Sequence, residues 1–210
     1  MVYPAPLLKG FIQHHFSNKK NGAGFTLIEL MIVISIVGVL SLVVMFNYST
    51  FNDRLALSSA GQEMAIAVRQ AQVYGLNVRE SSSGNFTSAF GVFIDPVSSP
   101  STYYIFADKD GNDLYDVGNG CGTALTECVE AIAIRNGVRI TSINTLLGCI
   151  GNRSLHITFL RPNPDAIITF ANLGGNSVCL LQPNAQIVLT SPKNSTLTVN
   201  VESTGQVLAQ

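Results

Sequence analysis

Charged side chains are scarce in this chain of 210 residues: Asp, Glu, Lys and Arg make up 12% of it, against 47% hydrophobic residues. Soluble globular domains usually carry about twice that share of charge. Much of the deficit falls in residues 25–46, whose only side chains that are not apolar are Thr26, Glu29, Ser35 and Ser41. These 22 residues contain no proline. A straight helix over them would be about 33 Å long, enough to cross a membrane.

Acidic residues are missing from the segment before this apolar run. That segment contains Lys9, Lys19 and Lys20 but no Asp or Glu. The residues after Phe46 contain nine Lys or Arg and twelve Asp or Glu, a formal charge of −3 (9 − 12). Short basic segments stay on the cytoplasmic side of a membrane. We therefore expect a single-pass protein of the cytoplasmic membrane, with its N-terminus in the cytoplasm and everything after Phe46 outside.

Motifs of catalytic sites are also missing. The chain has no glycine-framed serine elbow, no phosphate-binding loop and no metal-binding helix motif. His156 is the only histidine after the first 24 residues, and it alternates with Leu155, Ile157 and Phe159. Because alternate residues of a strand face opposite sides, we expect His156 to lie on the surface, away from the core. We predict that the protein is not an enzyme.

The four cysteines lack the two-residue spacing of common zinc sites, which argues against metal ligation. All of them follow Phe46, on the predicted outside, where an even number indicates two disulfides. Three pairings are possible. We favour Cys121–Cys128 as a local loop and Cys149–Cys179 as a link between more distant segments; four free thiols are the alternative.

The boundary between the basic segment and the apolar run has an unusual order. An ordinary secretory signal has its apolar stretch before the cleavage site, whereas here the basic residues come first, then Gly24, and only then the apolar run that begins at Phe25. A cut after Gly24 would remove all three lysines and leave the apolar run on the mature chain. Residues 24–30, GFTLIEL, with the run that follows, resemble the type IV prepilin signal of pilins and type II secretion pseudopilins.

The resemblance implies cleavage after Gly24 by a prepilin peptidase and N-methylation of Phe25. It also implies assembly with other pilin or pseudopilin subunits on an inner-membrane platform. A helix-kinking proline that one subclass of major pilins carries late in this segment is absent here, where Phe46 stands. Glu29 becomes the fifth mature residue and can pair with the freed amine of Phe25, in its own chain or a neighbour. A buried ion pair costs less than either charge alone.

The helix is expected to continue beyond the membrane as far as Tyr74. Apolar residues recur there at intervals of three and four, which is typical of an amphipathic helix that packs on a domain. Gly75 follows as the expected end of the helix. The residues of this apolar stripe are Ala60, Met64, Ala67, Val68, Ala71 and Tyr74.

Ten short β-branched or alternating runs follow Val78, many of them separated by turn residues, and they predict an antiparallel β domain. The fold class is therefore α+β and pilin-like, a long N-terminal helix packed on antiparallel sheet. We predict a leader (1–24), a transmembrane or filament-core helix (25–46), its amphipathic continuation (47–76) and an extracytoplasmic β domain (77–210). The ten runs are 89–94, 102–107, 131–135, 138–143, 155–160, 166–171, 178–181, 186–190, 196–201 and 206–209.

Three segments of this β domain are similar to the GspH/FimT-type minor pseudopilin domain. They are 90–95, which matches an early strand, 108–112, which matches an acidic turn, and 197–207, which matches a terminal hairpin. This second resemblance implies a minor subunit.

The acidic turn is also a candidate calcium site. Asp108, Asp110, Asn112 and Asp116 fall at the first, third, fifth and ninth places of a loop that alternates oxygen ligands. The glycine and glutamate of an EF-hand are absent at the sixth and twelfth places, where Asp113 and Asn119 stand. A solvated turn that uses Asp, Asn and Gly for its geometry is the alternative.

We therefore predict a structural subunit of a type IV pilus or a type II secretion pseudopilus. The alternative is a permanently anchored β domain that binds DNA or another ligand. Nucleic-acid binding has little support, because the basic residues after Phe46 are dispersed and no basic-aromatic run occurs. Folding could still gather Arg135, Arg139, Arg153 and Arg161.

Overall fold

A computed structural model describes residues 24–77, 88–116, 118, 120–123, 126–149, 154–172 and 177–210, except for the side chains of residues 47, 177 and 178. The expectations for the leader before Gly24 and for Arg153 lie outside the described residues. The chain divides into two compact units, Met1–Phe46 and Asn47–Gln210. A single helix, α1 (Leu27–Leu76), supplies residues to both units, and each unit is described by itself.

The first unit consists, in its described part, of the apolar half of α1. Every side chain from Phe25 to Phe46 is exposed, including bulky ones such as Ile28 and Phe46. The best 18-residue window of α1 has a mean hydropathy of 2.8, so the helix is long and apolar enough to cross a membrane. Ser35 and Ser41 donate their hydroxyls to the carbonyls of Ile32 (2.8 Å) and Val37 (2.7 Å) in the preceding turn, which leaves neither hydroxyl unsatisfied.

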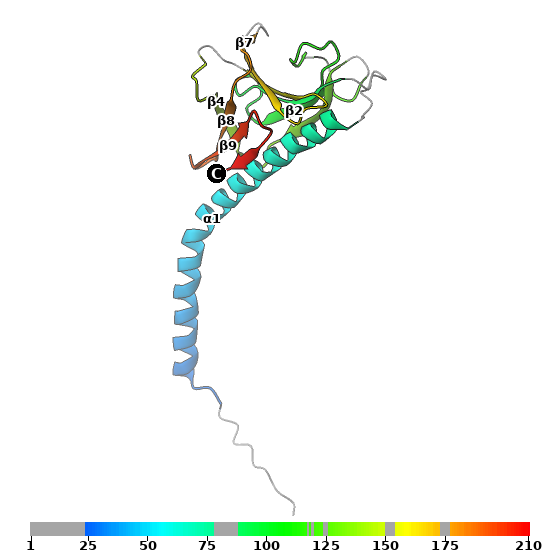
Figure 1. The fold of residues 1–210 in the computed structure, drawn as a ribbon. Helices are drawn as coiled ribbons and strands as arrows, with labels where there is room; N and C mark the ends of the chain where they lie inside the picture. The colour runs from blue at the N-terminus through cyan, green and yellow to red at the C-terminus, as the bar shows by residue number, and fades with distance from the viewer. Residues whose placement is uncertain are drawn as a thin grey trace, which may run out of the picture. The chain divides into compact units, whose positions relative to one another are not determined.

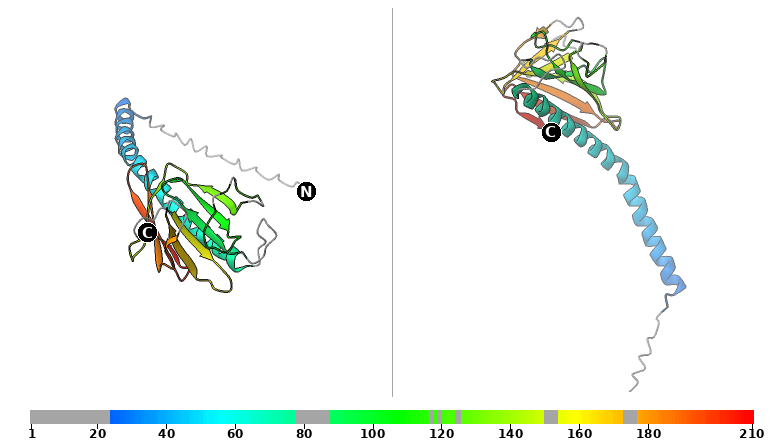
Figure 2. Two further views of the ribbon diagram at one scale, coloured as in Figure 1. Left: turned by 90° about the horizontal axis from the view of Figure 1, so that it is seen from above. Right: turned by 90° about the vertical axis from the view of Figure 1, so that its right-hand side faces the viewer.

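The second unit packs residues 47–76 of α1 against two antiparallel sheets (Figure 1). The six-stranded sheet has the order β3-β2-β1-β5-β6-β7, and the four-stranded sheet has the order β10-β9-β8-β4. Figure 2 shows the second half of α1 beside the strands of this unit in two further views. The strands are β1 (Phe90–Ile94), β2 (Thr102–Ala107), β3 (Cys128–Ala133), β4 (Arg139–Asn144), β5 (Ser154–Phe159), β6 (Ala166–Ala171), β7 (Ser177–Cys179), β8 (Asn184–Thr190), β9 (Thr196–Glu202) and β10 (Val207–Ala209).

One hydrophobic core joins the helix to the inner faces of both sheets. Met64, Val68 and Ala71 of the predicted stripe are fully buried in it, together with Ile157 of the first sheet and Ile187 of the second. This burial is the main stabilising contribution to the domain, since buried apolar area contributes about 25 cal/mol per Å². The α+β fold class is therefore confirmed, and residues of the predicted stripe lie in this core.

The ten predicted strands all form, with small shifts at their ends. The largest shift concerns the run 131–135, because β3 begins at Cys128 and ends at Ala133. Its pairing with β2 contains an irregularity between Ile105 and Phe106, which lets Cys128 stand opposite Phe106. A bulge of this kind cannot be read from alternation alone, because it changes the register within a strand.

The predicted helix end was wrong at Gly75, which lies inside α1, one residue before its last residue, Leu76. Its role is to permit close packing. A Cβ at this position would overlap the backbone carbonyl oxygen of Phe159. The glycine thus lets α1 lie directly on strand β5.

Candidate functional site

The predicted cleavage position is followed directly by the N-terminus of α1, which a threonine caps. Thr26 precedes α1, and its Oγ1 accepts a hydrogen bond from the backbone N–H of Glu29 (3.2 Å). The first helical backbone bond runs from Leu30 N to Thr26 O (3.1 Å). Residues 26–29, TLIE, have the spacing of a capping box. Sequence reasoning missed this role of Thr26, although the Thr-x-x-Glu signal was available.

Gly24, Phe25 and Glu29 are all exposed, and nothing lies within 4 Å of a Cβ built on Gly24. Glu29 is the acidic residue of the first helical turn, where the partial positive charge of the helix N-terminus favours a carboxylate. No described residue forms an ion pair with it. The arrangement leaves the peptide bond between Gly24 and Phe25 accessible and places one carboxylate about a turn beyond it.

The acidic turn after β2 folds around two carboxylates. Asp108 accepts hydrogen bonds from the backbone N–H groups of Gly111 (2.8 Å) and Asp113 (2.9 Å). Glu127 accepts from the backbone N–H groups of Lys109 and Asp116, each at 2.8 Å. Both side chains are buried, and their oxygen atoms therefore hold the loop from inside. Glu127 was not among the predicted residues, because it lies far from the turn in sequence.

Burial shifts the pKa values of these groups. Desolvation raises the pKa of Asp108 above its ordinary value, and the two backbone hydrogen bonds oppose that rise. Desolvation also raises the pKa of Glu127, again against its backbone hydrogen bonds. Asp113 shows the same direction, with desolvation raising its pKa. The turn therefore holds carboxylates that are costly to keep ionised.

The predicted calcium ligands are only partly brought together. Carboxylate oxygens of Asp108, Asp110 and Glu127 lie within 4.8 Å of one another, and Asp116 is not a member of this group. The Oδ1 atom of Asn112 accepts a hydrogen bond from Leu114 N (2.6 Å), which is a turn contact. The hydrogen bonds made by these side chains account for the turn without an ion, so calcium binding stays a prediction.

The surface position expected for His156 was wrong, because its side chain is only 3% exposed. The strand alternation placed it on the correct face, opposite the main core, but that face is covered by the segment that carries Tyr115. Nδ1 accepts a hydrogen bond from Tyr115 N (2.9 Å), and Nε2 lies 3.2 Å from Ser154 Oγ. Burial lowers the pKa of His156 to about 4.

These contacts also fix the proton on the imidazole. A ring nitrogen that accepts a backbone N–H carries no proton, so the proton of neutral His156 is on Nε2 and is donated to Ser154. A base that already donates to Ser154 cannot remove the serine proton. The pair of His156 and Ser154 is therefore structural and gives no support to a hydrolase.

Both disulfides are present in the structure, with the pairing that the sequence analysis favours. Cys121 and Cys128 are seven residues apart, and their Cα atoms lie 4.6 Å apart. Cys149 and Cys179 are 30 residues apart, with Cα atoms 6.2 Å apart. The second bond links the segment after β4, in one sheet, to β7 at the edge of the other.

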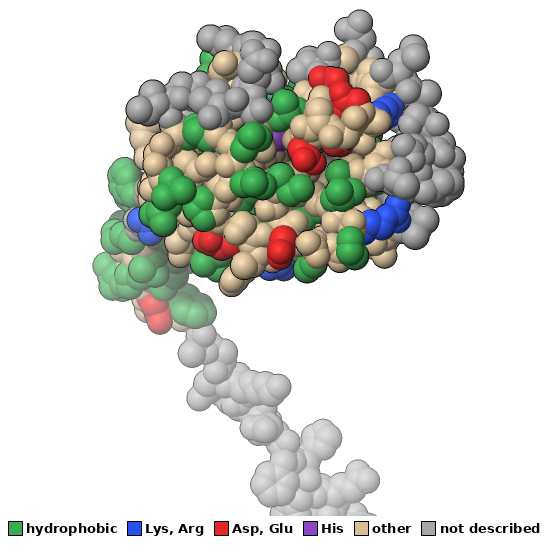
Figure 3. Space-filling model, turned by 45° about the horizontal axis from the view of Figure 1, so that its top comes forward, with side chains coloured by type: hydrophobic (Ala, Val, Ile, Leu, Met, Phe, Trp, Pro, Cys, Tyr) green, Lys and Arg blue, Asp and Glu red, His purple; other side chains and the backbone are tan. Residues whose placement is uncertain are grey.

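Basic side chains do not gather into a patch on the face shown in Figure 3, where Lys and Arg lie scattered near the margins and acidic side chains appear in several separate places. Arg135 and Arg139 are exposed beside the turn before β4. A dispersed arrangement of this kind gives little electrostatic attraction for a polyanion. This face therefore offers no support for nucleic-acid binding.

Comparison with known proteins agrees with the N-terminal geometry. The family described as "Prokaryotic N-terminal methylation motif" matches residues 19–45, which include Gly24, Phe25 and Glu29. The chain is also similar to a fimbrial protein of Dichelobacter nodosus, with 33% identity over 129 residues, covering 59% of this chain and 74% of that protein. No solved structure gives a significant match. From its N-terminal motif, its long apolar helix and this relative, the chain belongs to the type IV prepilin and pseudopilin family of structural subunits.

Proposed function

We propose that this protein is processed after Gly24 by a prepilin peptidase, methylated on Phe25, and built into a filament through the exposed apolar half of α1. The observation that carries the proposal is the matched methylation motif. It contains an accessible Gly24–Phe25 bond, followed by an apolar helix that Thr26 caps and whose side chains are all exposed as far as Phe46. The filament is a type IV pilus or a type II secretion pseudopilus. Before assembly, α1 anchors the chain in the cytoplasmic membrane, with the β domain outside.

Cleavage would supply the partner that Glu29 lacks. It frees the α-amine of Phe25, which stays able to carry a positive charge after methylation. Once the apolar helices pack together, Glu29 lies in a low-dielectric environment, where an unpaired charge costs several kcal/mol. Pairing with the amine of a neighbouring subunit offsets that cost and fixes the axial register between subunits.

Mass spectrometry of the native protein tests the processing. We expect a mature chain of 186 residues (210 − 24) that begins at Phe25 and carries one added methyl group. A native protein that keeps its leader would contradict the proposal. It would favour the alternative, a permanently anchored β domain that binds a ligand.

The register role of Glu29 has its own test. Glu29→Val removes the charge and keeps an apolar residue, so we expect the variant to be processed and inserted but to assemble into few filaments. Glu29→Asp, which keeps a carboxylate, is the matched control and should retain more assembly. Normal filament levels with Glu29→Val, measured by electron microscopy of sheared fibres, would exclude the register role while leaving the processing proposal intact.

The partners that follow from this function are other pilin or pseudopilin subunits, the peptidase and an inner-membrane assembly platform. Comparison of strains that lack either the pilus or the secretion system separates the two kinds of filament. Cross-linking of the chain into fibres should disappear in only one of these two strains. Assignment to the GspH/FimT-type minor subunits stays a prediction.

A further inference from the structure

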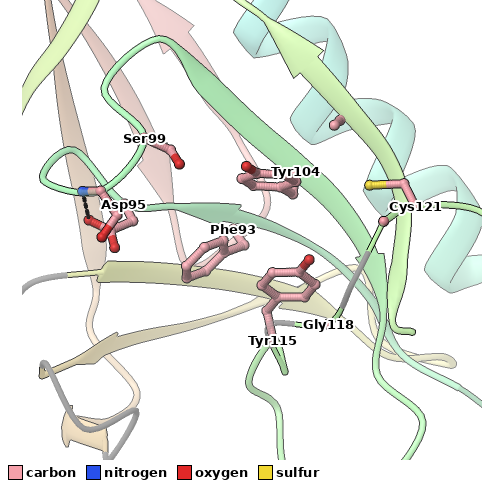
Figure 4. A pocket seen from close by; sticks show the side chains of 10 residues that line it. Phe93, Asp95, Ser99, Tyr104, Tyr115, Gly118 and Cys121 are labelled. Atoms are coloured by element: carbon pink, nitrogen blue, oxygen red, sulfur yellow. Dashed lines mark hydrogen bonds between the residues drawn. The ribbon is translucent and has the colours of Figure 1, made fainter. Parts of the chain in front are cut away.

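An open pocket of about 480 Å³ lies on the side of the six-stranded sheet that faces away from the helix. Pockets of this size hold small organic ligands. Its lining includes Phe93 of β1, Tyr104 of β2 and Tyr115 from the segment that follows β2. Figure 4 shows these three rings side by side, with Asp95 and Ser99 next to them on one side of the pocket.

The three rings form a continuous apolar wall. The ring centroids of Phe93 and Tyr115 are 4.7 Å apart, and those of Phe93 and Tyr104 are 6.0 Å apart. Tyr104 and Tyr115 are stacked, with centroids 5.8 Å apart and planes 16° from parallel. Phe93 and Tyr115 are buried, whereas Tyr104 is half-buried. Tyr104 therefore presents the largest open ring surface to a ligand.

Uncharged and acidic groups surround this wall. The phenol hydroxyls of Tyr104 and Tyr115 form no hydrogen bond with the rest of the described chain. Asp95 and Ser99 add a carboxylate and a hydroxyl to the lining. None of the described lining residues is Lys or Arg, so nothing there would balance the charge of a phosphate or carboxylate ligand.

The pocket is held in place before any ligand arrives. Asp95 Oδ1 accepts hydrogen bonds from Val97 N and Ser98 N, both at 2.9 Å, and these bonds fix the turn that carries Ser99. The backbone of Tyr115 is held by its hydrogen bond to His156. A preformed site of this kind loses little entropy when it binds.

We propose that this pocket binds a neutral carbohydrate, with the C–H face of one pyranose ring on Tyr104 and the sugar hydroxyls bonded to Asp95, Ser99 and the tyrosine hydroxyls. A sugar combines a flat apolar face with several donors and acceptors, which is the combination that this lining offers. An organic ammonium ion fits less well. Such ions prefer rings that surround them, whereas these rings pack on one another. The proposal concerns the β domain and does not depend on processing or assembly.

Saturation-transfer NMR on the full chain tests this binding. The chain is placed in phosphatidylglycerol nanodiscs, which contain neither sugar nor quaternary ammonium. The probes are the methyl glycosides of glucose, galactose, mannose, N-acetylglucosamine and N-acetylgalactosamine, at roughly 10 mM to detect millimolar affinity. We expect saturation transfer to at least one glycoside, strongest at the C–H groups of one ring face.

Three tyrosine variants identify the site. Tyr104→Ala should weaken binding by about tenfold, because it removes the stacking surface. Tyr104→Phe keeps the ring and should retain most of the affinity. Tyr48→Ala is the matched control, since Tyr48 is 62% exposed in α1 and does not line the pocket; it should leave binding unchanged.

Several results would overturn the proposal. These are the absence of transfer to all five glycosides, equal binding by Tyr104→Ala and the unchanged chain, or equal losses in Tyr104→Phe and Tyr104→Ala. Binding of tetramethylammonium without binding of any glycoside would replace the sugar site with a cation site. Circular dichroism of each variant identifies a loss of glycoside binding that comes from misfolding. If Tyr104→Ala misfolds, the binding measured with Tyr104→Phe decides whether the aromatic ring holds the sugar.

Discussion

His156 shows how one buried side chain can hold a loop on a sheet. It stands on β5, accepts the backbone N–H of Tyr115 and lies against the ring of Phe93, with ring centroids 4.9 Å apart. The neutral imidazole serves as both acceptor and donor, as this position requires. A protonated ring would have two donors and would face the N–H of Tyr115 with another N–H.

We predict that His156 makes folding stability fall as the pH is lowered from about 6.5 to about 4. The unfolded chain takes up a proton on His156 near pH 6.5, whereas burial lowers the folded-state pKa to about 4. Because the unfolded state binds more protons in this window, stability is lost there by up to ~1.4 kcal/mol per pH unit. Thermal unfolding of the full chain at several pH values measures the loss.

His156→Gln is the control, since glutamine retains an acceptor and a donor but does not titrate here. Buried carboxylates act in the opposite direction. Desolvation raises the pKa values of Asp108, Asp113 and Glu127 in the folded chain. Protonation of these groups therefore increases the stability of the folded chain as the pH falls. The difference between the unchanged chain and His156→Gln isolates the histidine. A difference that stays constant between pH 7 and pH 4 would contradict its role.

At the scale of elements, α1 meets the β domain closely at two glycines, where an added Cβ would come too near a neighbouring atom. Gly75 lies on the backbone carbonyl of Phe159, and a Cβ at Gly61 would lie 2.5 Å from Leu197 Cδ2. A backbone group cannot move aside, whereas the end of a leucine side chain can rotate. These two glycines therefore differ in what they tolerate, although both lie within a helix.

We predict that Gly75→Ala lowers the free energy of unfolding by about 2 kcal/mol, as overpacking against fixed atoms does. Gly61→Ala is the matched comparison and should cost less than about 1 kcal/mol. Its small clash is offset by the better helix propensity of alanine. Urea unfolding of both variants gives the values. A smaller loss for Gly75→Ala than for Gly61→Ala would show that α1 does not rest on β5 as described.

The acidic turn depends on Glu127, a residue from outside it that stands just before β3. Both oxygens of Glu127 hold backbone N–H groups of the turn. Glu127→Gln replaces one of these acceptors with a donor, so we expect a loss of about 1–3 kcal/mol. Glu130→Gln, on the exposed side of β3, should change stability little. Equal stabilities of the two variants in urea unfolding would contradict this account.

The same samples test the calcium prediction. Of the predicted ligands, Asp108 and Asp110 lie close together, with Glu127 beside them. If these three hold the ion, millimolar calcium raises the melting temperature of the unchanged chain, and Glu127→Gln abolishes that rise. Calorimetry should then show a calcium-dependent heat. The absence of both the heat and the shift would contradict calcium binding and leave the turn as a hydrogen-bonded loop.

At the scale of the whole molecule, the two disulfides stabilise different parts. Cys149–Cys179 links the segment after β4 to β7 over a separation of 30 residues, whereas Cys121–Cys128 closes a loop over seven. Chain-entropy estimates give about 3.5 kcal/mol for the longer loop and about 2.5 kcal/mol for the shorter. We expect Cys149→Ala with Cys179→Ala to lower the midpoint of urea unfolding more than Cys121→Ala with Cys128→Ala. The opposite order would contradict the estimate.

Local patterns were sufficient to predict most of the architecture. The apolar run, the stripe through Met64 and Ala71, and the ten β-branched runs are each set by neighbouring residues, so their periods could be read directly. Gly75 was misread because a glycine that ends a helix and a glycine that permits close packing look the same in sequence. His156 was misread because alternation gives the face of a strand and not what covers that face.

The sequence by itself determined the N-terminal methylation motif, which the family match places at residues 19–45. Gly24, Phe25 and Glu29 lie within six residues of one another, and the motif depends only on that spacing and on the apolar run that follows. Only the tertiary structure decided which distant groups meet: Glu127 with Asp108, His156 with Tyr115, and Tyr104 with Phe93 in the pocket. The physical reason is the separation along the chain of the residues that make each contact. A cleavage motif and a helix are built from local contacts, whereas a buried network or a pocket depends on strand order and register, which distant residues settle together.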